Sequence, residues 1–374
     1  MTTELESYYK DYISKTHIAY TDEKCIERGV FATEDIKIGD TLLKLPMTEV
    51  MNGSHIELTY ALMGLDNEYS RSLPVCITNF PVMWTESEIN GIQGSAMQEM
   101  IPSRKKKLME EDVQKKGPLF LHYRLLVGSR AFCPDENKDL YLVPYADMLN
   151  HSNDPNVDWK VKDGYFIMKA LHPIAKDAQC FDTYGVKTNY EQLLFYGMNL
   201  KDNLRHDITY EMIEIPVKLR TNLNYNHFRN VIEYEMCGSY SRGTHEIFSF
   251  LRFLACANSN SKESPKQLNG FTCDPISKAN ELVVARVMYN AMVGSYNKKI
   301  SNFRYCSDKV ASFAETEVKV LQHWVSVLKI ACDVLNSKNM KEAKKKMSKV
   351  EDNDYLHKVV KKLVFNKQAY KSKG

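Results

Sequence analysis

Alternating apolar and polar positions fill much of the first half of the chain and predict short strands separated by tight turns. Residues 28–46, RGVFATEDIKIGDTLLKLP, give an apolar strand, a turn around Gly39 and a second strand. A similar layout returns at 165–184. Just ahead of it, Asp163-Gly164 is a strong hairpin signal because glycine tolerates positive φ. These segments predict a β domain built from several small sheets.

Helical spacing interrupts the strands between residues 52 and about 127 and returns from about residue 205. In the first of these regions, Thr85 and Glu88 have the spacing of a capping box. We therefore expect an α+β protein, with a β domain over 1–204 that carries a helical insertion at about 52–127, and an all-α domain over 205–374. Two apolar stripes mark helices of the second domain: Ile247, Phe250, Leu251 and Leu254, and then Val310, Phe313, Val320, Leu321, Trp324, Leu328 and Leu335.

Composition narrows the choice of function without deciding it. The 374 residues are 44% hydrophobic and 26% charged, which is ordinary for a folded protein with a real core. The net charge of +3 is too small to imply nucleic-acid binding. Residues 341–374 hold eleven Lys against four acids, and a solvated helix face explains this more simply than a nuclear or nucleic-acid signal.

Cysteine spacing and hydropathy bear on location. The nine Cys include no C-x-x-C pair, which argues against a structural zinc site and suits reduced thiols in the cytoplasm or nucleus. The polar N-terminus lacks the pattern of a secretory signal. No apolar run approaches the roughly 18 residues that a membrane span needs.

Several catalytic classes lack their motifs. The chain has no Gly-x-Ser-x-Gly, no P-loop and no Gly-x-Gly-x-x-Gly. The polar stretch YADMLNHSNDPNV, residues 145–157, contains His151, Asp147 and Asp154, but these lie in one segment without a second His or Cys at ligand spacing. We therefore expect no metal site.

An ordered set of motifs carries a resemblance instead. RGVFA at 28–32 is followed by GSRAF at 128–132, ADMLNHS at 146–152 and TYG…TNYEQLLFYGM at 183–198. In this order the sequence resembles SET-domain methyltransferases, and among them the branch of the Rubisco large-subunit methyltransferases. That branch has a SET domain split by a helical insertion and followed by a helical domain. The resemblance covers most of the chain and is strongest over 128–198.

The resemblance implies S-adenosyl-L-methionine as the cofactor. Asn150 and His151 match the pair that holds its amino-acid and adenine ends, and Arg130 matches the residue that binds its carboxylate. Where many relatives have a first glycine in the cofactor loop, this chain has Glu27, which is expected to weaken affinity. The loop still offers groups of Arg28, Gly29, Val30 and Phe31.

The resemblance also implies a protein lysine as the methyl acceptor. Tyr184 matches the active-site tyrosine, which polarises the site or orients the amine and also borders the cofactor. Ser129 and Asp147 match positions that contact the substrate ammonium, and Asp147 could equally be a helix N-cap. Phe132 and Phe181 are candidates to line the space around the amine.

Three hypotheses follow. Phe132 and Ala146 favour a lysine methyltransferase over the histidine methyltransferase known in the same branch. Glu27 is the main support for a third hypothesis, a catalytically weak SET-fold module that binds proteins. For the enzyme, we expect a monomer whose helical domain docks the substrate protein, in the cytoplasm or nucleus, without membrane or nucleic-acid partners.

Overall fold

The chain divides into two compact units in its computed structural model, which describes residues 3–21, 28–110, 114–134, 139–198, 208–214, 231–237, 242–257, 274–303, 308–348 and 353–366. The first, which we call the sheet unit, comprises residues 1–83, 101–187 and 191–198. The second, the helical unit, comprises residues 84–100, 188–190 and 199–374.

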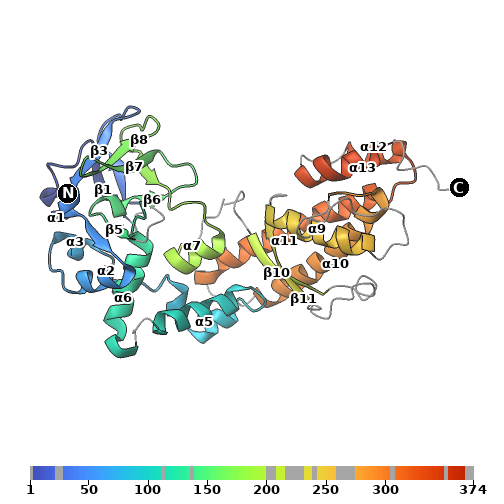
Figure 1. Cartoon of the computed structure of the whole chain (residues 1–374), viewed down its shortest axis with the longest axis horizontal. Coiled ribbons are helices and arrows are strands. Elements are labelled where there is room, and N and C mark those ends of the chain that lie inside the picture. The colour runs from blue at the N-terminus through green and yellow to red at the C-terminus, as the bar shows by residue number, and fades with distance from the viewer. Residues whose placement is uncertain are drawn as a thin grey trace. The chain divides into compact units, whose positions relative to one another are not determined.

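The described residues of the sheet unit form three small sheets, as the alternating pattern predicts (Figure 1). One has the order β1-β2-β9-β6, one the order β3-β8-β7, and one pairs β4 with β5. The strands are β1 (Thr16–Tyr20), β2 (Arg28–Ala32), β3 (Thr41–Pro46), β4 (Met51–Gly53), β5 (Leu140–Leu142), β6 (Asn150–His151), β7 (Val157–Lys162), β8 (Tyr165–Ala170) and β9 (Gln179–Asp182).

Turn chemistry fixes the register of these strands. Asp163 and Gly164 have φ values of 52° and 76°, so the β7–β8 hairpin turns as predicted, in the conformation that suits the twist of its strands. Gly39, at φ 84°, makes the turn that leads into β3. Along the strands, residues such as Val30 and Leu45 are buried in one continuous core.

Helices surround these sheets where the insertion was expected. Within the sheet unit, α2 packs against α6, and α1 packs against α3. Serine and asparagine N-caps start α2 and α3, each in a reciprocal capping box. The helices of this unit are α1 (Glu4–Tyr8), η1 (Met47–Glu49), α2 (His55–Met63), α3 (Glu68–Ser72), η2 (Pro81–Met83), α5 (Met97–Leu108, which begins in the helical unit), α6 (Gln114–Arg130), η4 (Ala146–Met148) and α7 (Asn189–Tyr196, which also begins there).

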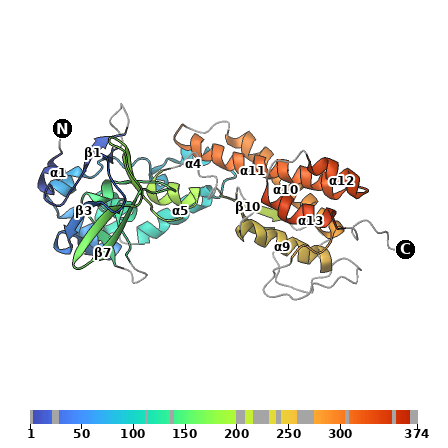
Figure 2. The same cartoon turned by 90° about the horizontal axis from the view of Figure 1, so that it is seen from above.

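The helical unit contains long helices (Figure 2) and, unlike the all-α domain we expected, a two-stranded antiparallel sheet (Figure 1). The capping box of Thr85 and Glu88 is present at the start of its first helix. Its elements are α4 (Glu86–Asn90), β10 (Ile208–Glu214), β11 (Val231–Cys237), α9 (Arg242–Ala257), α10 (Lys278–Phe303), α11 (Asp308–Leu335), α12 (Met340–Met347), η5 (Leu356–Val360) and α13 (Lys361–Val364).

A buried ion pair lies in the core of the helical unit. Arg252 of α9 donates from Nε to Oε2 of Glu281 in α10 at 2.7 Å, and the Tyr355 hydroxyl donates to the other carboxylate oxygen at 2.8 Å. Both charged side chains are fully buried, and such pairs fix which helices meet more than they add stability. In the ranges that the structure describes, no helix has the length and apolar character needed to cross a bilayer.

Candidate functional site

Strands β2, β6 and β9 bring the predicted cofactor residues together in the sheet unit. Asn150 pairs with Phe181 across the parallel β6–β9 contact, and β2 lies on the other side of β9. The Asn150 side-chain amide donates to the backbone oxygen of Arg28 at 3.0 Å, which ties β6 to the start of β2. Residues far apart in sequence therefore form one polar corner.

Glycine at position 29 permits this close approach. A Cβ atom there would lie 2.2 Å from Nε2 of Gln179 and 3.0 Å from Nδ2 of Asn150. The first distance is shorter than real side chains show and the second is tight, so any larger residue at position 29 would displace the amide ends of Gln179 and Asn150 from this corner. Val30, the next residue of β2, is buried in the core, and the Phe31 ring lies 6.2 Å from that of His17.

Tyr184 is held at its backbone, its ring and its hydroxyl. Its N–H donates to Nδ1 of His151 at 3.0 Å, and its hydroxyl donates to the backbone oxygen of Leu149 at 2.8 Å. Its ring stacks on His151 at 5.1 Å between centroids and on Tyr196 at 5.0 Å. Leu149 and His151 of the ADMLNHS motif and Tyr196 of α7 thus position the predicted active-site tyrosine.

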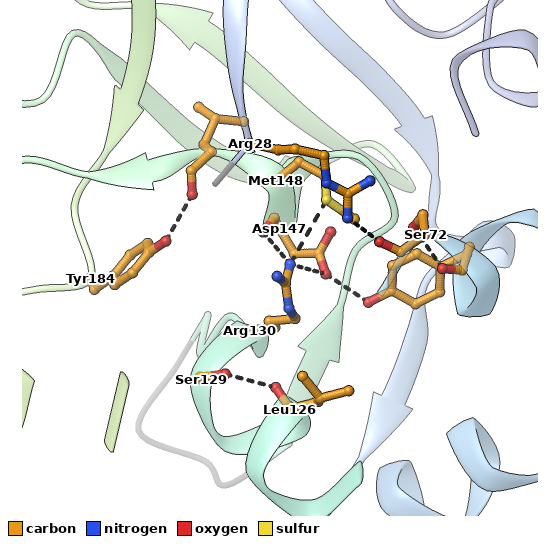
Figure 3. A network of polar contacts seen from close by, with 10 residues as sticks. Arg28, Ser72, Leu126, Ser129, Arg130, Asp147, Met148 and Tyr184 are labelled. Atoms are coloured by element: carbon orange, nitrogen blue, oxygen red, sulfur yellow. Dashed lines mark hydrogen bonds and ion pairs between the residues drawn. The ribbon is translucent and has the colours of Figure 1, made fainter. Parts of the chain in front are cut away.

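Arg130 and Asp147 form a partly buried pair close to Tyr184 (Figure 3). Nη1 of Arg130 donates to the backbone oxygen of Asp147 at 2.8 Å and approaches its carboxylate Oδ2 at 3.3 Å. The same oxygen accepts the hydroxyl of Tyr69 at 2.8 Å. The Asp147 side chain is 0% exposed, whereas that of Arg130 is 18% exposed and so reaches the surface of the site.

The local backbone of this pair is unusual. Asp147 lies inside η4, and Tyr145 occupies the N-cap position that we considered for Asp147. Tyr145 has a φ of 70°, which is rare for a residue with a side chain, and its buried hydroxyl lies 2.9 Å from that of Thr16. Packing around Tyr145 therefore holds a strained turn directly before Asp147.

Arg28 and Ser129 have partners within the protein. A guanidinium nitrogen of Arg28 donates to the backbone oxygen of Ser72, at the end of α3 (Figure 3). The Ser129 hydroxyl, in the last turn of α6, donates to the backbone oxygen of Leu126 at 3.2 Å. Ser129 thus precedes Arg130 at the helix end that delivers the arginine to the site.

The two predicted aromatic residues have different surroundings. Phe132 bridges to Tyr141 and contacts two rings of the β7–β8 hairpin, Trp159 at 5.3 Å and Phe166 at 5.2 Å. Phe181 is partly buried on β9, beside Asn150. Phe132 thus belongs to an aromatic cluster of the core, and Phe181 lies next to the polar corner.

Burial shifts the titration of the site's acids and phenols. Desolvation raises the pKa of Asp147, while the charge of Arg130 and the Tyr69 hydrogen bond act in the opposite direction. Burial raises the pKa of Asp182 to about 6, partly offset by the Thr183 N–H on its carboxylate. The pKa of Tyr184 lies well above its ordinary value, again through burial, so its phenol keeps its proton at neutral pH.

Three residues of the site were not found from the sequence. Tyr69 contacts Asp147 across 78 positions of sequence, and Tyr196 stacks on Tyr184 from the end of α7. Asp182 directly precedes the Thr183-Tyr184 pair at the end of β9. Of these three, Asp182 alone could have been suspected from the sequence, because it is a carboxylate at the end of a predicted strand, two residues before Tyr184.

The described part of the chain contains no group of three or more His, Cys, Asp and Glu side chains arranged to hold a metal ion. Glu27, the departure in the cofactor loop, lies outside the described residues.

The site lies within a segment that matches a known family. Residues 27–185 match the family model of the SET domain, and Tyr184 falls at the end of that match. The chain therefore carries a SET domain, interrupted by the helical insertion.

Three curated relatives align with parts of the chain. Ribosomal lysine N-methyltransferase 1 of Saccharomyces cerevisiae is 32% identical over 27% of this chain and 18% of its own length. N-lysine methyltransferase setd6 of Salmo salar is 25% identical over 52% of this chain and 37% of its own length. A third, SETD6 of Rattus norvegicus, is 38% identical over 15% of this chain and 12% of its own length. The chain thus covers well under half of each relative.

Solved structures extend the similarity in fold to nearly the whole chain. The SET domain of LSMT bound to lysine and AdoHcy has a TM-score of 0.60, with 19% identity, over 95% of this chain and 97% of that one. Rubisco LSMT bound to AdoMet has a TM-score of 0.58 and 17% identity over 96% and 99%. The fold is therefore the predicted α+β fold of a split SET domain followed by a mainly helical unit.

Proposed function

We propose that this protein is an S-adenosylmethionine-dependent protein-lysine N-methyltransferase with Tyr184 as its active-site tyrosine. The observation that carries the proposal is the placement of Tyr184, fixed through its N–H, its ring and its hydroxyl beside Asn150 and His151. Three curated relatives named as lysine methyltransferases support the same reaction.

The residues at the corner fit the proposed cofactor. Arg130 offers a partly exposed guanidinium for a carboxylate, and the amide oxygen of Asn150, which its bond to Arg28 does not use, can accept from an ammonium. Next to Gly29, the buried Nε2 of Gln179 has no hydrogen-bond partner among the described residues. This donor, with the backbone of β2, suits a polar ligand at the corner. When bound, S-adenosylmethionine supplies a methyl group on a sulfonium.

The chain's own residues then have two tasks, alignment and control of the amine. A lysine amine attacks only when neutral, and its ordinary pKa of about 10.4 must fall, which a desolvated channel achieves. Tyr184 keeps its proton and directs it at Leu149, so its oxygen can accept a hydrogen bond from the amine and orient the nitrogen lone pair. Tyr184 therefore acts as a fixed dipole and not as a base.

Residues around the site favour lysine over histidine as the acceptor. Phe132 and Ala146, both in the sheet unit, occupy the positions that are aromatic and small in the lysine enzymes that the sequence resembles.

The test is transfer of labelled methyl from S-adenosylmethionine to proteins of an extract prepared from cells that lack this enzyme. Mass spectrometry of the labelled peptide should find methyl-lysine. Methyl-histidine would refute the lysine assignment, and no transfer to any protein would favour the binding module.

We infer that the helical unit docks the substrate protein through lysines of α12. Lys344 and Lys345 are exposed, while Ala343 and Met347 of the same helix are buried in the core. The expected partner surface is acidic protein rather than nucleic acid. Replacing both lysines with Glu should raise the KM for the protein substrate and leave affinity for S-adenosylmethionine unchanged. An unchanged KM would remove α12 from the docking surface.

We also place the enzyme in the cytoplasm or nucleus as a monomer. The nine Cys without a C-x-x-C pair, and the buried free thiol of Cys180 in the sheet unit, support a reducing compartment. Fractionation of cells and sedimentation of the purified chain test the two expectations.

A further inference from the structure

Tyr69, in the helical insertion, holds the buried carboxylate that orients Arg130. It is 1% exposed, and its hydroxyl donates to Oδ2 of Asp147, the same oxygen that faces Nη1 of Arg130. The Tyr69 hydroxyl thus contacts the carboxylate partner of Arg130, which is one of the residues predicted to bind the cofactor.

The position of Tyr69 is itself well determined. It lies in α3, which begins with a capping box between Asn67 and Ser70 and packs against α1. The end of the same helix supplies the Ser72 oxygen that accepts from Arg28. One short helix therefore contacts both arginines predicted to bind the cofactor, Arg28 directly and Arg130 through Tyr69 and Asp147.

Asp147 needs this support because its carboxylate is fully buried. Oδ1 has no hydrogen-bond partner among the described residues, whereas Oδ2 contacts both Tyr69 and Arg130. Removing one of two partners from a buried carboxylate costs more than the same change at the surface. It also makes the protonated form of the acid easier to reach, and a protonated Asp147 no longer attracts Arg130.

We propose that Tyr69 is a positioning residue that keeps Asp147 ionised and Arg130 aimed at the cofactor's carboxylate. The inference rests on the proposed function for the identity of the ligand, but its contact chain of Tyr69, Asp147 and Arg130 is independent of it. It gives the helical insertion a role in the cofactor site, although the insertion lies outside the motifs that identify a SET domain.

Other groups near Asp147 set the pH range in which this role can be observed. Arg130 and Arg28 favour the ionised carboxylate. The phenols of Tyr69, Tyr9 and Tyr184 are coupled to it by charge, and burial raises the pKa of all three, so they remain neutral near pH 7. The carboxyl of Asp147 is therefore the acid of this set, and desolvation raises its pKa while Arg130 and the Tyr69 hydrogen bond oppose that rise.

The test is calorimetric titration of the full chain with S-adenosylmethionine at pH 6.5 and pH 8.5, for the wild type and for Tyr69→Phe. We expect the variant to bind about tenfold more weakly at pH 6.5, the size expected for loss of one hydrogen bond to a charged group, and less than about threefold more weakly at pH 8.5. Turnover at saturating cofactor should remain near the wild-type value.

Tyr9→Phe is the matched control. Tyr9 is a buried tyrosine of the same unit, coupled to Asp147 by charge but with no hydroxyl hydrogen bond among the described residues. It should bind the cofactor like the wild type. Equal affinity of Tyr69→Phe and wild type at both pH values would overturn the inference, as would an equal loss at both values accompanied by a lower melting temperature.

A second measurement keeps the inference separate from the proposed function. The Tyr69→Phe and Asp147→Ala changes should be non-additive in the free energy of unfolding of the ligand-free protein, because either change alone removes the hydrogen bond between the two side chains. A wild-type chain that binds no S-adenosylmethionine would refute the proposed function alone. Additive effects of the two substitutions would refute the Tyr69 inference alone.

Discussion

The backbone N–H of Tyr184 donates to Nδ1 of His151 at 3.0 Å while the two rings stack at 5.1 Å between their centroids. Nδ1 therefore acts as an acceptor, and the neutral imidazole carries its proton on Nε2. The histidine of the Asn-His-Ser motif serves in this way to position the tyrosine, a structural role that needs neither a metal nor proton transfer.

Replacing His151 with Phe should lower the rate of methyl transfer with little loss of folded protein. Phenylalanine keeps the ring stack but offers no acceptor to the Tyr184 N–H, so the tyrosine shifts. A shift of about 1 Å near the reacting atoms costs up to about a hundredfold in rate. Single-turnover kinetics measure the effect. His172→Phe, at an exposed position of the same unit, is the control, and equal rates for both variants would contradict the positioning role.

Replacing Gly29 with Ala should impair cofactor binding more than global stability. The new Cβ would lie 2.2 Å from the Gln179 amide nitrogen, so the side chains of Gln179 and Asn150 must move from the corner. We expect affinity for S-adenosylmethionine to fall at least about tenfold, a change of about 1.4 kcal/mol. Gly64→Ala is the matched control, since the nearest atom to its Cβ would be 3.7 Å away. Calorimetry that finds the same affinity for both variants would disprove the packing argument.

Asp182→Asn should make the protein more stable at alkaline pH and change little in acid. The pKa of the folded-state carboxyl is raised from 3.8 to about 6, so the folded protein binds this proton more tightly than the unfolded chain. Its stabilising contribution is complete below about pH 4 and is lost as the pH rises through 6. Asparagine still accepts from the Thr183 N–H, which donates to Oδ1 at 2.7 Å, but carries no buried charge.

Urea unfolding at pH 4.5 and pH 8 measures this difference. The variant should gain up to about 3 kcal/mol over the wild type at pH 8 and about 1 kcal/mol at pH 4.5. Asp163→Asn, which removes an exposed carboxylate from the turn of the β7–β8 hairpin, is the control. A difference for Asp182→Asn that is the same at both pH values would contradict the raised pKa of Asp182.

Local chemistry explains why much of the fold could be predicted from sequence. The Asp163-Gly164 turn and the Thr85 capping box depend on residues within a few positions of each other, and both are present. Strands β10 and β11 were missed because each has only seven residues, and their pairing joins segments at 208–214 and 231–237 within a helical region.

The residues of the site likewise fall into those that the sequence could identify and those that it could not. Its motif residues, Asn150, His151 and Tyr184, could be recognised from their order along the chain, and β6 and β9 bring them together. Tyr69 could not be found, because nothing in the sequence around a helical tyrosine says which distant carboxylate its hydroxyl meets. The roles of Ser129, Phe132 and Phe181 toward a substrate remain predictions.

The most direct test of the central claim is methyl transfer by Tyr184→Phe under single-turnover conditions with saturating S-adenosylmethionine. Tyr165→Phe, which removes a tyrosine hydroxyl from strand β8, serves as the control. If the Tyr184 hydroxyl orients the lysine amine, its loss should slow transfer about a hundredfold or more while the affinity for S-adenosylmethionine stays within about threefold of wild type. Transfer at the wild-type rate by Tyr184→Phe would contradict the assignment of Tyr184 as the active-site tyrosine.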